Sequence, residues 1–232
     1  MIKKLVIAIT AFASAQFTCA QEIIFQNQKF EPHGVTASVV TLNGRQALKV
    51  ERDLKTLPFD VNNLSKTVDE PTYVRLKDID FENGVIEVKV FSQVQNPSPF
   101  EGAQGFIGIA FRISPRDSAY ESIYLRPKAG SSNNQFNRNH SVQYYAYPNY
   151  KFDKLRNEPN SSYETYADIG LDEWIDMRIE VTGNKATLYI NGQKRPSFIV
   201  ERMKGNTTHG EVALWVDIGT IGYFKDLKVT KR

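Results

Sequence analysis

The sequence predicts an all-β fold, a jelly-roll β-sandwich of two antiparallel sheets. Short stretches in which apolar and polar residues alternate recur along the chain, and a period of two is the signature of half-buried strands. The breaks between these stretches are rich in Gly, Pro, Asn and Ser, and no long amphipathic helical pattern competes with them. Short strands separated by turn residues in this way are typical of sandwiches and jelly rolls.

The clearest element is a β-hairpin within residues 173–192. Each of its two strands carries apolar residues at alternate positions: Ile175, Met177, Ile179 and Val181 on the first, and Ala186, Leu188 and Ile190 on the second. Gly183-Asn184 supplies the turn between them, and Asn191-Gly192 closes the second strand. We therefore expect both apolar faces to lie in the core.

The other expected strands follow in order along the chain. They lie near 23–26, 35–41, 46–51, 73–76, 84–92, 104–113, 119–126, 141–147, 162–167, 197–200, 211–217 and 222–229. Six side chains from these strands and the hairpin are predicted to lie in the core: Ile107, Ile109, Phe111, Ile179, Leu188 and Leu214. The least regular segments are 53–72, 93–103 and 127–161. Connections as long as the last one are usually functional or mobile.

The last quarter of the chain carries a resemblance to a known superfamily. Trp174 with the alternating strand that ends in Tyr189-Ile-Asn-Gly192, then residues 210–216 and 222–229, resemble the closing strands of concanavalin A-like lectin/glucanase domains. The chain is also similar to laminin-G-like and 3-keto-disaccharide hydrolase-like secreted bacterial domains. The resemblance implies a sandwich with a concave sheet that holds a glycan. Lectins, glycosidases, lyases and adhesion modules share this fold, so it does not specify the function.

The first 20 residues have the layout of a secretory signal peptide. Lys3 and Lys4 precede an apolar run over residues 5–15, and Thr18 and Ala20 are small. The run is shorter than the roughly 20 apolar residues that a membrane-spanning helix needs. We expect residues 21–232 to form one secreted or periplasmic domain without an integral membrane segment in the mature chain.

The single cysteine, Cys19, lies in the cleavage region. It is either the lipid attachment site of a lipoprotein or a residue lost with the signal, and Thr18 is a larger neighbour than we would expect before a lipidated cysteine. Without another cysteine, the mature domain can form no internal disulfide and has no thiol for catalysis or zinc binding.

Length and charge limit the classes of function. A mature chain of about 210 residues suits one all-β domain. The net charge is +3, and the basic residues are dispersed among acidic ones. We therefore expect no nucleic-acid partner, while local clusters of arginine leave a preference for anionic ligands open.

Polar and aromatic residues alternate with the core residues on several strands. We place them on the concave face that the resemblance implies, where aromatic platforms and planar hydrogen-bonding groups would form an oligo- or polysaccharide site. The predicted ligand-binding residues are Arg112, Tyr120, Tyr124, Arg126, Asn139, Gln143, Trp215 and Asp217. The alternative is an ordinary strand face, since tyrosine is favoured in strands in any case.

Two enzymatic interpretations compete with a carbohydrate-binding domain. A retaining glycoside hydrolase needs two carboxyl groups ~5–5.5 Å apart, and the Glu-x-Asp-x-x-Glu string of family 16 glucanases is absent. A polysaccharide lyase needs a base and a cationic clamp for an acidic sugar. His140 or Tyr145 would be the base, with Arg126 or Arg112 as the clamp. His140 is otherwise a packing residue of its loop. The strings of known alginate lyases are missing, so the sequence favours the binding domain.

A structural calcium ion is a further hypothesis, because domains of this fold often bind one. Asp226 and Asp217 are the candidate ligands. No dense run of oxygen ligands is visible around them, which favours the alternative that both are turn carboxylates exposed to water.

Overall fold

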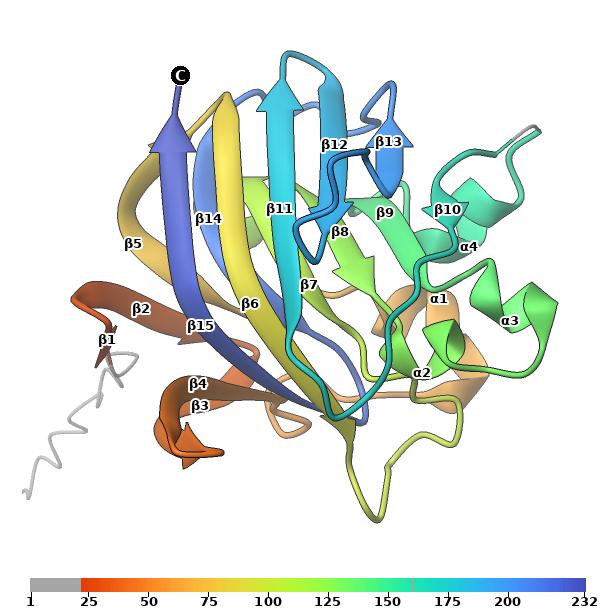
Figure 1. Cartoon of the computed structure of the whole chain (residues 1–232), viewed down its shortest axis with the longest axis horizontal. Helices are drawn as coiled ribbons and strands as arrows, with labels where there is room; N and C mark the ends of the chain where they lie inside the picture. Colours follow the sequence, from red (N-terminus) through yellow and green to blue (C-terminus); the bar gives the residue numbers. More distant parts are fainter. Residues whose placement is uncertain (1–21, 160) are drawn as a thin grey trace, which may run out of the picture.

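Two antiparallel sheets stack face to face in the computed structural model, which describes residues 22–159 and 161–232 (Figure 1). The expected signal peptide and Cys19 lie outside the described residues. Four short helices gather at one side of the stack (Figure 1). The all-β jelly-roll sandwich predicted from the alternating pattern is confirmed. Among the described residues, no helix has the length and apolar composition needed to cross a bilayer.

The first sheet, called sheet A, has eight strands. Its spatial order is β1 (Ile23–Phe25), β2 (Gln28–His33), β5 (Tyr73–Phe81), β14 (Gly210–Val216), β7 (Ile107–Ile113), β8 (Tyr120–Leu125), β9 (Val142–Tyr147) and β10 (Glu164–Thr165). Strands β7, β8 and β9 are neighbours in sequence and in space. Segment 53–72 leads from β4 (Arg45–Arg52) to β5 and segment 95–106 from β6 (Gly84–Val94) to β7, in each case from the second sheet to sheet A, while 126–141 and 148–163 flank β9. Residues of all four segments line one pocket over sheet A.

The second sheet, sheet B, has seven strands. Its order is β13 (Phe198–Val200), β12 (Lys185–Ile190), β11 (Ile175–Thr182), β6 (Gly84–Val94), β15 (Thr220–Lys231), β4 (Arg45–Arg52) and β3 (Val35–Leu42). The predicted hairpin is β11 and β12, paired from Met177 opposite Ile190 to Thr182 opposite Lys185. Its expected turn at Gly183-Asn184 is therefore confirmed.

The core lies between the two sheets, where the alternation predicted it. The six side chains expected there are at most 2% exposed and belong to one apolar cluster. Along β11, apolar residues are buried at every second position, from Ile175 to Val181. Each such side chain contributes about 1.5–3 kcal/mol relative to an exposed position, so the cluster is the main source of the stability of the sandwich.

The structure adds elements that the pattern did not predict. Strand β2 contains Pro32, which argues against a strand in sequence terms. Here Pro32 pairs with Val74 on one side and lies beyond Phe30, the last residue paired with β1. Strand β5 continues past residue 76 to Phe81, because a bulge with a positive φ at Asp78 accommodates its polar stretch.

Four helices of four or five residues were also not expected. They are α1 (Leu64–Thr67), α2 (Pro127–Gly130), α3 (Gln135–Arg138) and α4 (Phe152–Arg156). All four fall in the segments that the sequence marks as irregular. Helices this short carry too few periodic positions for an amphipathic pattern to be recognised.

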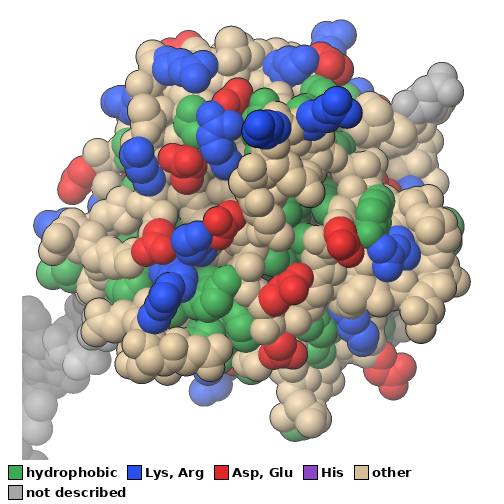
Figure 2. Space-filling view, viewed as in Figure 1, with side chains coloured by type: hydrophobic (Ala, Val, Ile, Leu, Met, Phe, Trp, Pro, Cys, Tyr) green, Lys and Arg blue, Asp and Glu red, His purple; other side chains and the backbone are tan. Residues whose placement is uncertain are grey.

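The outer face of sheet B is open and mixed in charge. Basic and acidic side chains alternate over β15, β6 and β11, with apolar surface between them (Figure 2). Phe91, Tyr223 and half-buried Trp174 form a small aromatic cluster there. Nζ of Lys225 lies 3.9 Å from the centre of the Trp174 ring.

Candidate functional site

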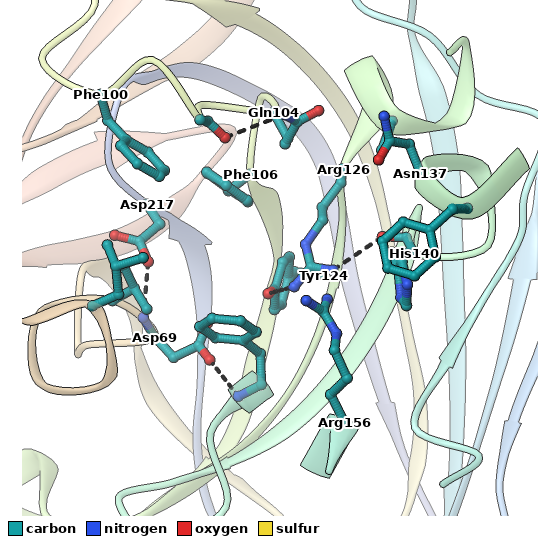
Figure 3. A pocket seen from close by; sticks show the side chains of 16 residues that line it. Asp69, Phe100, Gln104, Phe106, Tyr124, Arg126, Asn137, His140, Arg156 and Asp217 are labelled. Atoms are coloured by element: carbon teal, nitrogen blue, oxygen red, sulfur yellow. Dashed lines mark hydrogen bonds between the residues drawn. The ribbon is translucent and has the colours of Figure 1, made fainter. Parts of the chain in front are cut away.

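A pocket of about 280 Å³ lies over the outer face of sheet A, beside the short helices. Tyr124 of β8 lies at its base, and the segments 53–72, 95–106, 126–141 and 148–163 contribute residues to its walls (Figure 3). The lining residues are Leu64, Val68, Asp69, Phe100, Gly102, Gln104, Phe106, Tyr124, Arg126, Ala129, Phe136, Asn137, His140, Phe152, Arg156 and Asp217. Aromatic walls and a few polar groups are thus combined in one concave site, as small-ligand sites require.

Aromatic residues of sheet A support the base of the pocket. The ring centre of Tyr124 lies 4.8 Å from that of Trp215 and 5.8 Å from that of Tyr145. Trp215 donates its indole N–H to the carbonyl of Glu70 at 2.9 Å. The hydroxyls of Tyr145 and Tyr120 are hydrogen-bonded to each other at 3.0 Å. These rings are packed and satisfied, so they hold Tyr124 in place.

The Arg126 guanidinium is fully engaged at the pocket wall. Nη2 donates to the Tyr124 hydroxyl at 2.5 Å and to Oε1 of Gln143 at 3.2 Å. Nη1 donates to the carbonyl of His140 at 3.1 Å and to Oε1 of Glu164 at 2.8 Å. The four hydrogens of the two Nη atoms are therefore used within the protein, and Arg126 positions its neighbours.

Glu164 of β10 contacts three basic side chains from different segments. It accepts from Arg126, from Nε of Arg156 at 2.8 Å and from a second nitrogen of Arg156. Its Oε2 also lies 2.9 Å from Nδ1 of His140, although that contact lacks hydrogen-bond geometry. Burial opposes ionisation of Glu164, but the hydrogen bonds and charges of both arginines outweigh it and lower its pKa.

His140 and Asp69 face the pocket from opposite sides (Figure 3). Burial lowers the pKa of His140 below its usual value of 6.5, and this outweighs the opposing effect of Glu164. Burial, followed by the nearby charge of Asp217, raises the pKa of Asp69 to about 7. The two environments thus favour a neutral imidazole and a carboxyl group that stays partly protonated near neutral pH.

Asp217 anchors the Asp69 side of the pocket. Its Oδ1 accepts from Nη1 of Arg52 at 2.7 Å, and its Oδ2 accepts the backbone N–H of Asp69 at 2.8 Å. Oδ2 of Asp69 in turn accepts the backbone N–H of Phe152 at 2.8 Å. Among the described residues, no hydrogen bond reaches the other carboxylate oxygen of Asp69.

The structure brings some predicted residues together at the pocket and places others behind it. Tyr124, Arg126, His140 and Asp217 line the pocket. Gln143 lies behind Arg126 and is fully buried. Two other aromatic residues predicted to bind the ligand, Tyr120 and Trp215, are 0% exposed, and so is Tyr145, the alternative base. They cannot stack on a ligand unless the loops move.

The placement of Arg112 in the concave groove was wrong. Its guanidinium donates to the carbonyls of Glu82 and Gly183, in the turns that precede β6 and β12 of sheet B. Arg112 has a φ of 53°, and the pairing of β7 with β14 shifts register at this point. This bulge breaks the alternation on which the face assignment depended.

The other candidates lie apart from the pocket. Asn139 is exposed and accepts from the side chain of Gln135 at 2.7 Å. Asp226, exposed on β15, accepts from Gln26 at 3.0 Å, whereas Asp217 lies at the pocket. The two aspartates proposed for calcium therefore do not share a site. Within residues 22–159 and 161–232, no group of three or more His, Cys, Asp or Glu side chains could hold a metal ion.

Sequence reasoning missed most of the pocket walls. The missed residues include Asp69, Phe100, Gln104, Phe136, Asn137, Phe152 and Arg156, with Glu164 behind them. Nearly all of them fall within or directly beside the three segments marked as irregular. The length of those segments was the available signal, and it identifies a region without identifying single residues.

The two stacked sheets, with this pocket on one outer face, define a β-sandwich domain of the concanavalin A-like type. The family model described as the 3-keto-alpha-glucoside-1,2-lyase-like domain matches residues 64–230, and the chain belongs to this family. The resemblance noted in the sequence is thereby confirmed. The search of curated proteins found no match.

Solved structures share the fold at low sequence identity. Carbohydrate binding module CBM66 from Bacillus subtilis is 9% identical with a TM-score of 0.50, and the match covers 84% of this chain and 94% of that one. A GH43 protein from Bacillus licheniformis is 11% identical with a TM-score of 0.50, over 92% of this chain and 38% of that one. At such identities the likeness concerns the architecture alone.

Proposed function

We propose that the pocket binds a neutral sugar ring and that the domain catalyses an elimination at that ring. The observation that carries the proposal is the placement of His140 and Asp69 on opposite sides of one aromatic-walled pocket, with pKa values shifted in opposite directions. Two titratable groups separated in this way are what general acid-base catalysis requires. Phe106, half-buried in the wall, supplies apolar surface for the CH face of a sugar, and Tyr124 packs beneath the pocket with 1% of its surface exposed.

The charges around the pocket favour a neutral sugar over an acidic one. A uronate would need a free guanidinium, yet the Nη hydrogens of Arg126 are engaged within the protein. Arg156 donates to both carboxylate oxygens of Glu164, so its guanidinium is also engaged within the protein. This argues against the acidic-glycan lyase in which Arg126 clamps the substrate.

The family description suggests the reaction class, a 1,2-elimination from a 3-keto glucoside. The C3 carbonyl acidifies the C2–H bond. A base removes that proton, the electron pair forms the C1=C2 double bond, and the C1–O bond breaks. The leaving oxygen keeps the bonding pair and takes a proton from an acid. The products are an unsaturated keto sugar and a free alcohol, so atoms and charges balance without another reactant.

The two pocket residues divide these roles. His140 is the base, because its lowered pKa keeps the imidazole neutral. Asp69 is the acid, because its raised pKa of about 7 keeps a share of the carboxyl protonated near neutral pH. Tyr145, the other base considered from the sequence, is held by Tyr120, and burial raises its pKa well above the usual value.

The test follows the ultraviolet absorbance of the unsaturated ketone from a 3-keto glucoside. His140→Gln and Asp69→Asn should each lower kcat by about 10²–10⁴-fold if they act as base and acid. Asp168→Asn, at a carboxylate whose side chain is 90% exposed, is the matched control and should keep full activity.

Saturation-transfer NMR with the same sugar separates catalysis from binding. Saturable binding without product in the native chain would replace the lyase by a carbohydrate-binding domain, the second candidate. Absence of both binding and product would overturn the proposal, as would full activity of both variants.

We also propose that residues 1–20 direct export and that residues 21–232 form the mature domain in the periplasm or outside the cell. The charged start, the apolar run and the small residues support this. N-terminal sequencing of the exported protein and metabolic labelling with a fatty acid would test it. Retention of Met1 would contradict export, and a labelled Cys19 would establish the lipid-anchored alternative.

A further inference from the structure

The four edge strands of the two sheets differ in length. In sheet A the edge strands β1 and β10 have three and two residues, and in sheet B the edge strand β13 has three. The other edge of sheet B is β3, which has eight residues and pairs with β4 in an unbroken register (Figure 1). Long regular edges offer unpaired backbone groups to other chains, and natural proteins usually shorten or interrupt them. Strand β3 is therefore the edge to which another strand could be added.

The sequence of β3 favours pairing. It reads Val-Thr-Ala-Ser-Val-Val-Thr-Leu, rich in the β-branched residues that strands prefer. Charged residues, proline and bulges commonly protect an exposed edge, and β3 contains none of them. Half of its residues are exposed, and among them Val39 presents an apolar side chain that is 40% exposed. This edge thus lacks the features that oppose association.

The turn between β3 and β4 indicates which backbone groups of β3 are free. Asn43 and Gly44 form a two-residue turn with positive φ angles, and Leu42 lies opposite Arg45. Residues that flank such a turn exchange backbone hydrogen bonds, and every second residue along the strand repeats this pattern. The remaining residues direct their N–H and C=O groups away from β4: Val35, Ala37, Val39 and Thr41. Among the described residues, no strand pairs with that side of β3.

We infer that β3 pairs with β3 of a second copy of this chain, antiparallel about a two-fold axis that passes through Ser38. In this register Val39 lies opposite Ala37 of the second copy, and Val35 lies opposite Thr41 of the second copy. All four residues with free backbone groups then find a partner, which gives about eight hydrogen bonds between the copies. The two seven-stranded sheets would become one continuous sheet.

Charge favours a second copy as the occupant of this edge. Because β3 is uncharged, its pairing with itself brings no like charges opposite each other. The nearest charged neighbour of Ser38 on β4 is Lys49, and its Nζ lies 2.5 Å from the Glu51 carboxylate. The surface beside the axis is therefore locally neutral. Ser38 is small and exposed, so two copies can approach closely at the axis.

The pairing goes beyond the proposed function and does not depend on it. No residue of β3 lines the pocket over sheet A. An interface of one strand pair lies at the low end of interface sizes, below about 1,200 Å². We therefore expect a reversible dimer, in which both pockets stay open.

Sedimentation velocity over a range of protein concentrations measures the association. The native chain should show a fraction of dimer that rises with concentration. Ser38→Lys and Ser38→Glu should each weaken dimerisation at least about tenfold, because like charges meet at the axis. A mixture of these two variants should restore the dimer, since opposite charges then meet. Ile199→Lys places a charge on the other edge of sheet B and is the matched control, which should behave as the native chain does.

Disulfide cross-linking tests the register. Cys19, the only cysteine of the chain, is first replaced by serine. Ser38→Cys should then form a dimer on mild oxidation, because directly opposed residues of this kind have Cα atoms about 4.5 Å apart, within the range of a disulfide. Thr36→Cys is the matched control. Its counterpart in the second copy lies four residues further along the strand, about 13 Å away, so it should not cross-link.

Three results would overturn the inference. A native chain that is monomeric at every concentration would exclude the dimer. A dimer that persists unchanged in both Ser38→Lys and Ser38→Glu would place the interface elsewhere. Cross-linking of Thr36→Cys as readily as Ser38→Cys would contradict the axis at Ser38. Thermal unfolding of each variant verifies that a loss of dimer does not arise from a loss of fold.

Discussion

Arg52 and Asp217 form a buried ion pair that joins the end of β4 to the residue that follows β14. Nη1 lies 2.7 Å from Oδ1, and both side chains are at most 3% exposed. The same arginine also donates to the carbonyls of Leu57, Pro58 and Thr67. One guanidinium therefore fastens the 53–72 segment, which carries Asp69, to the sandwich.

Replacement of Arg52 by methionine should destabilise the protein by about 3–5 kcal/mol, because Asp217 would remain as a buried charge without its partner. Urea unfolding measures the change. The control is Lys185→Met, which breaks an exposed pair with Glu201. Exposed pairs contribute little, so this variant should stay within about 1 kcal/mol of the native chain. Equal effects in the two variants would contradict the structural role of Arg52.

Leu188→Ala should cost about 2–5 kcal/mol, the sum of lost burial and the cavity left between the sheets. Leu188 is 0% exposed. Ile199→Ala on the neighbouring strand β13 is the comparison, since Ile199 is 38% exposed and should change stability by less than about 1 kcal/mol. Thermal unfolding monitored by circular dichroism would show both effects, and an unchanged melting curve for Leu188→Ala would refute the core assignment.

The stability of the protein should fall between about pH 4.5 and pH 7 because of Glu121. This carboxyl group accepts from the Tyr144 hydroxyl, and burial raises its pKa from 4.5 to about 7. A group with a raised folded-state pKa binds its proton more tightly in the folded chain. Its stabilising effect is complete below about pH 4.5 and is lost as the pH rises to about 7. The shift corresponds to about 3 kcal/mol.

Glu121→Gln should therefore flatten the dependence of unfolding free energy on pH over this range. Glu101→Gln, in an exposed turn, is the control and should give a curve parallel to the native one. Asp69 acts in the same direction, because its pKa is also raised to about 7. Part of the slope should therefore remain in Glu121→Gln, and a slope identical to that of the native chain would exclude a role for Glu121.

Trp215→Phe should lower stability by about 1–3 kcal/mol, because it removes buried volume and leaves the carbonyl of Glu70 without the indole N–H. Considered from the sequence alone, truncation of Trp215 would weaken glycan binding without unfolding. The buried position of the ring reverses that expectation. Sugar affinity measured well below the melting temperature should change less than stability does.

The pH dependence of turnover tests the two catalytic roles. Activity should rise as His140 loses its proton, at a pH below 6.5, and fall as Asp69 loses its proton near pH 7. The expected kcat/KM profile is a narrow bell. In Asp69→Asn, the residual activity should lack the alkaline limb, and persistence of that limb would assign it to another group.

The sandwich was predictable because the alternation of apolar and polar residues along each strand is local and periodic. In the hairpin β11 and β12, every second side chain enters the core, and the turn residues mark the boundary. The prediction failed where periodicity breaks. The bulge at Arg112 directs its side chain to the carbonyls of Glu82 and Gly183 instead of the pocket, and Pro32 argued against a strand where β2 lies.

The pocket was less predictable because its contacts are long-range. Asp69 and Phe152 are hydrogen-bonded across 83 positions of the chain, and Arg126 and Glu164 across 38. No spacing rule connects such residues. Residue type was informative for Tyr124, Arg126 and His140, which lie on or beside predictable strands. Residue type gave no indication that Asp69, which lies in an irregular connection, would reach the pocket.

The positions of the two tryptophans suggest a way to follow ligand binding by fluorescence. Trp174 lies on sheet B beneath Lys225, while Trp215 touches Tyr124 at the base of the pocket. The chain has no other tryptophan. Replacing Trp174 by phenylalanine would leave one indole, whose ring centre lies 4.8 Å from that of Tyr124 at the base of the pocket. The emission of that single fluorophore would then report occupancy of the pocket directly, without a label or a coupled assay.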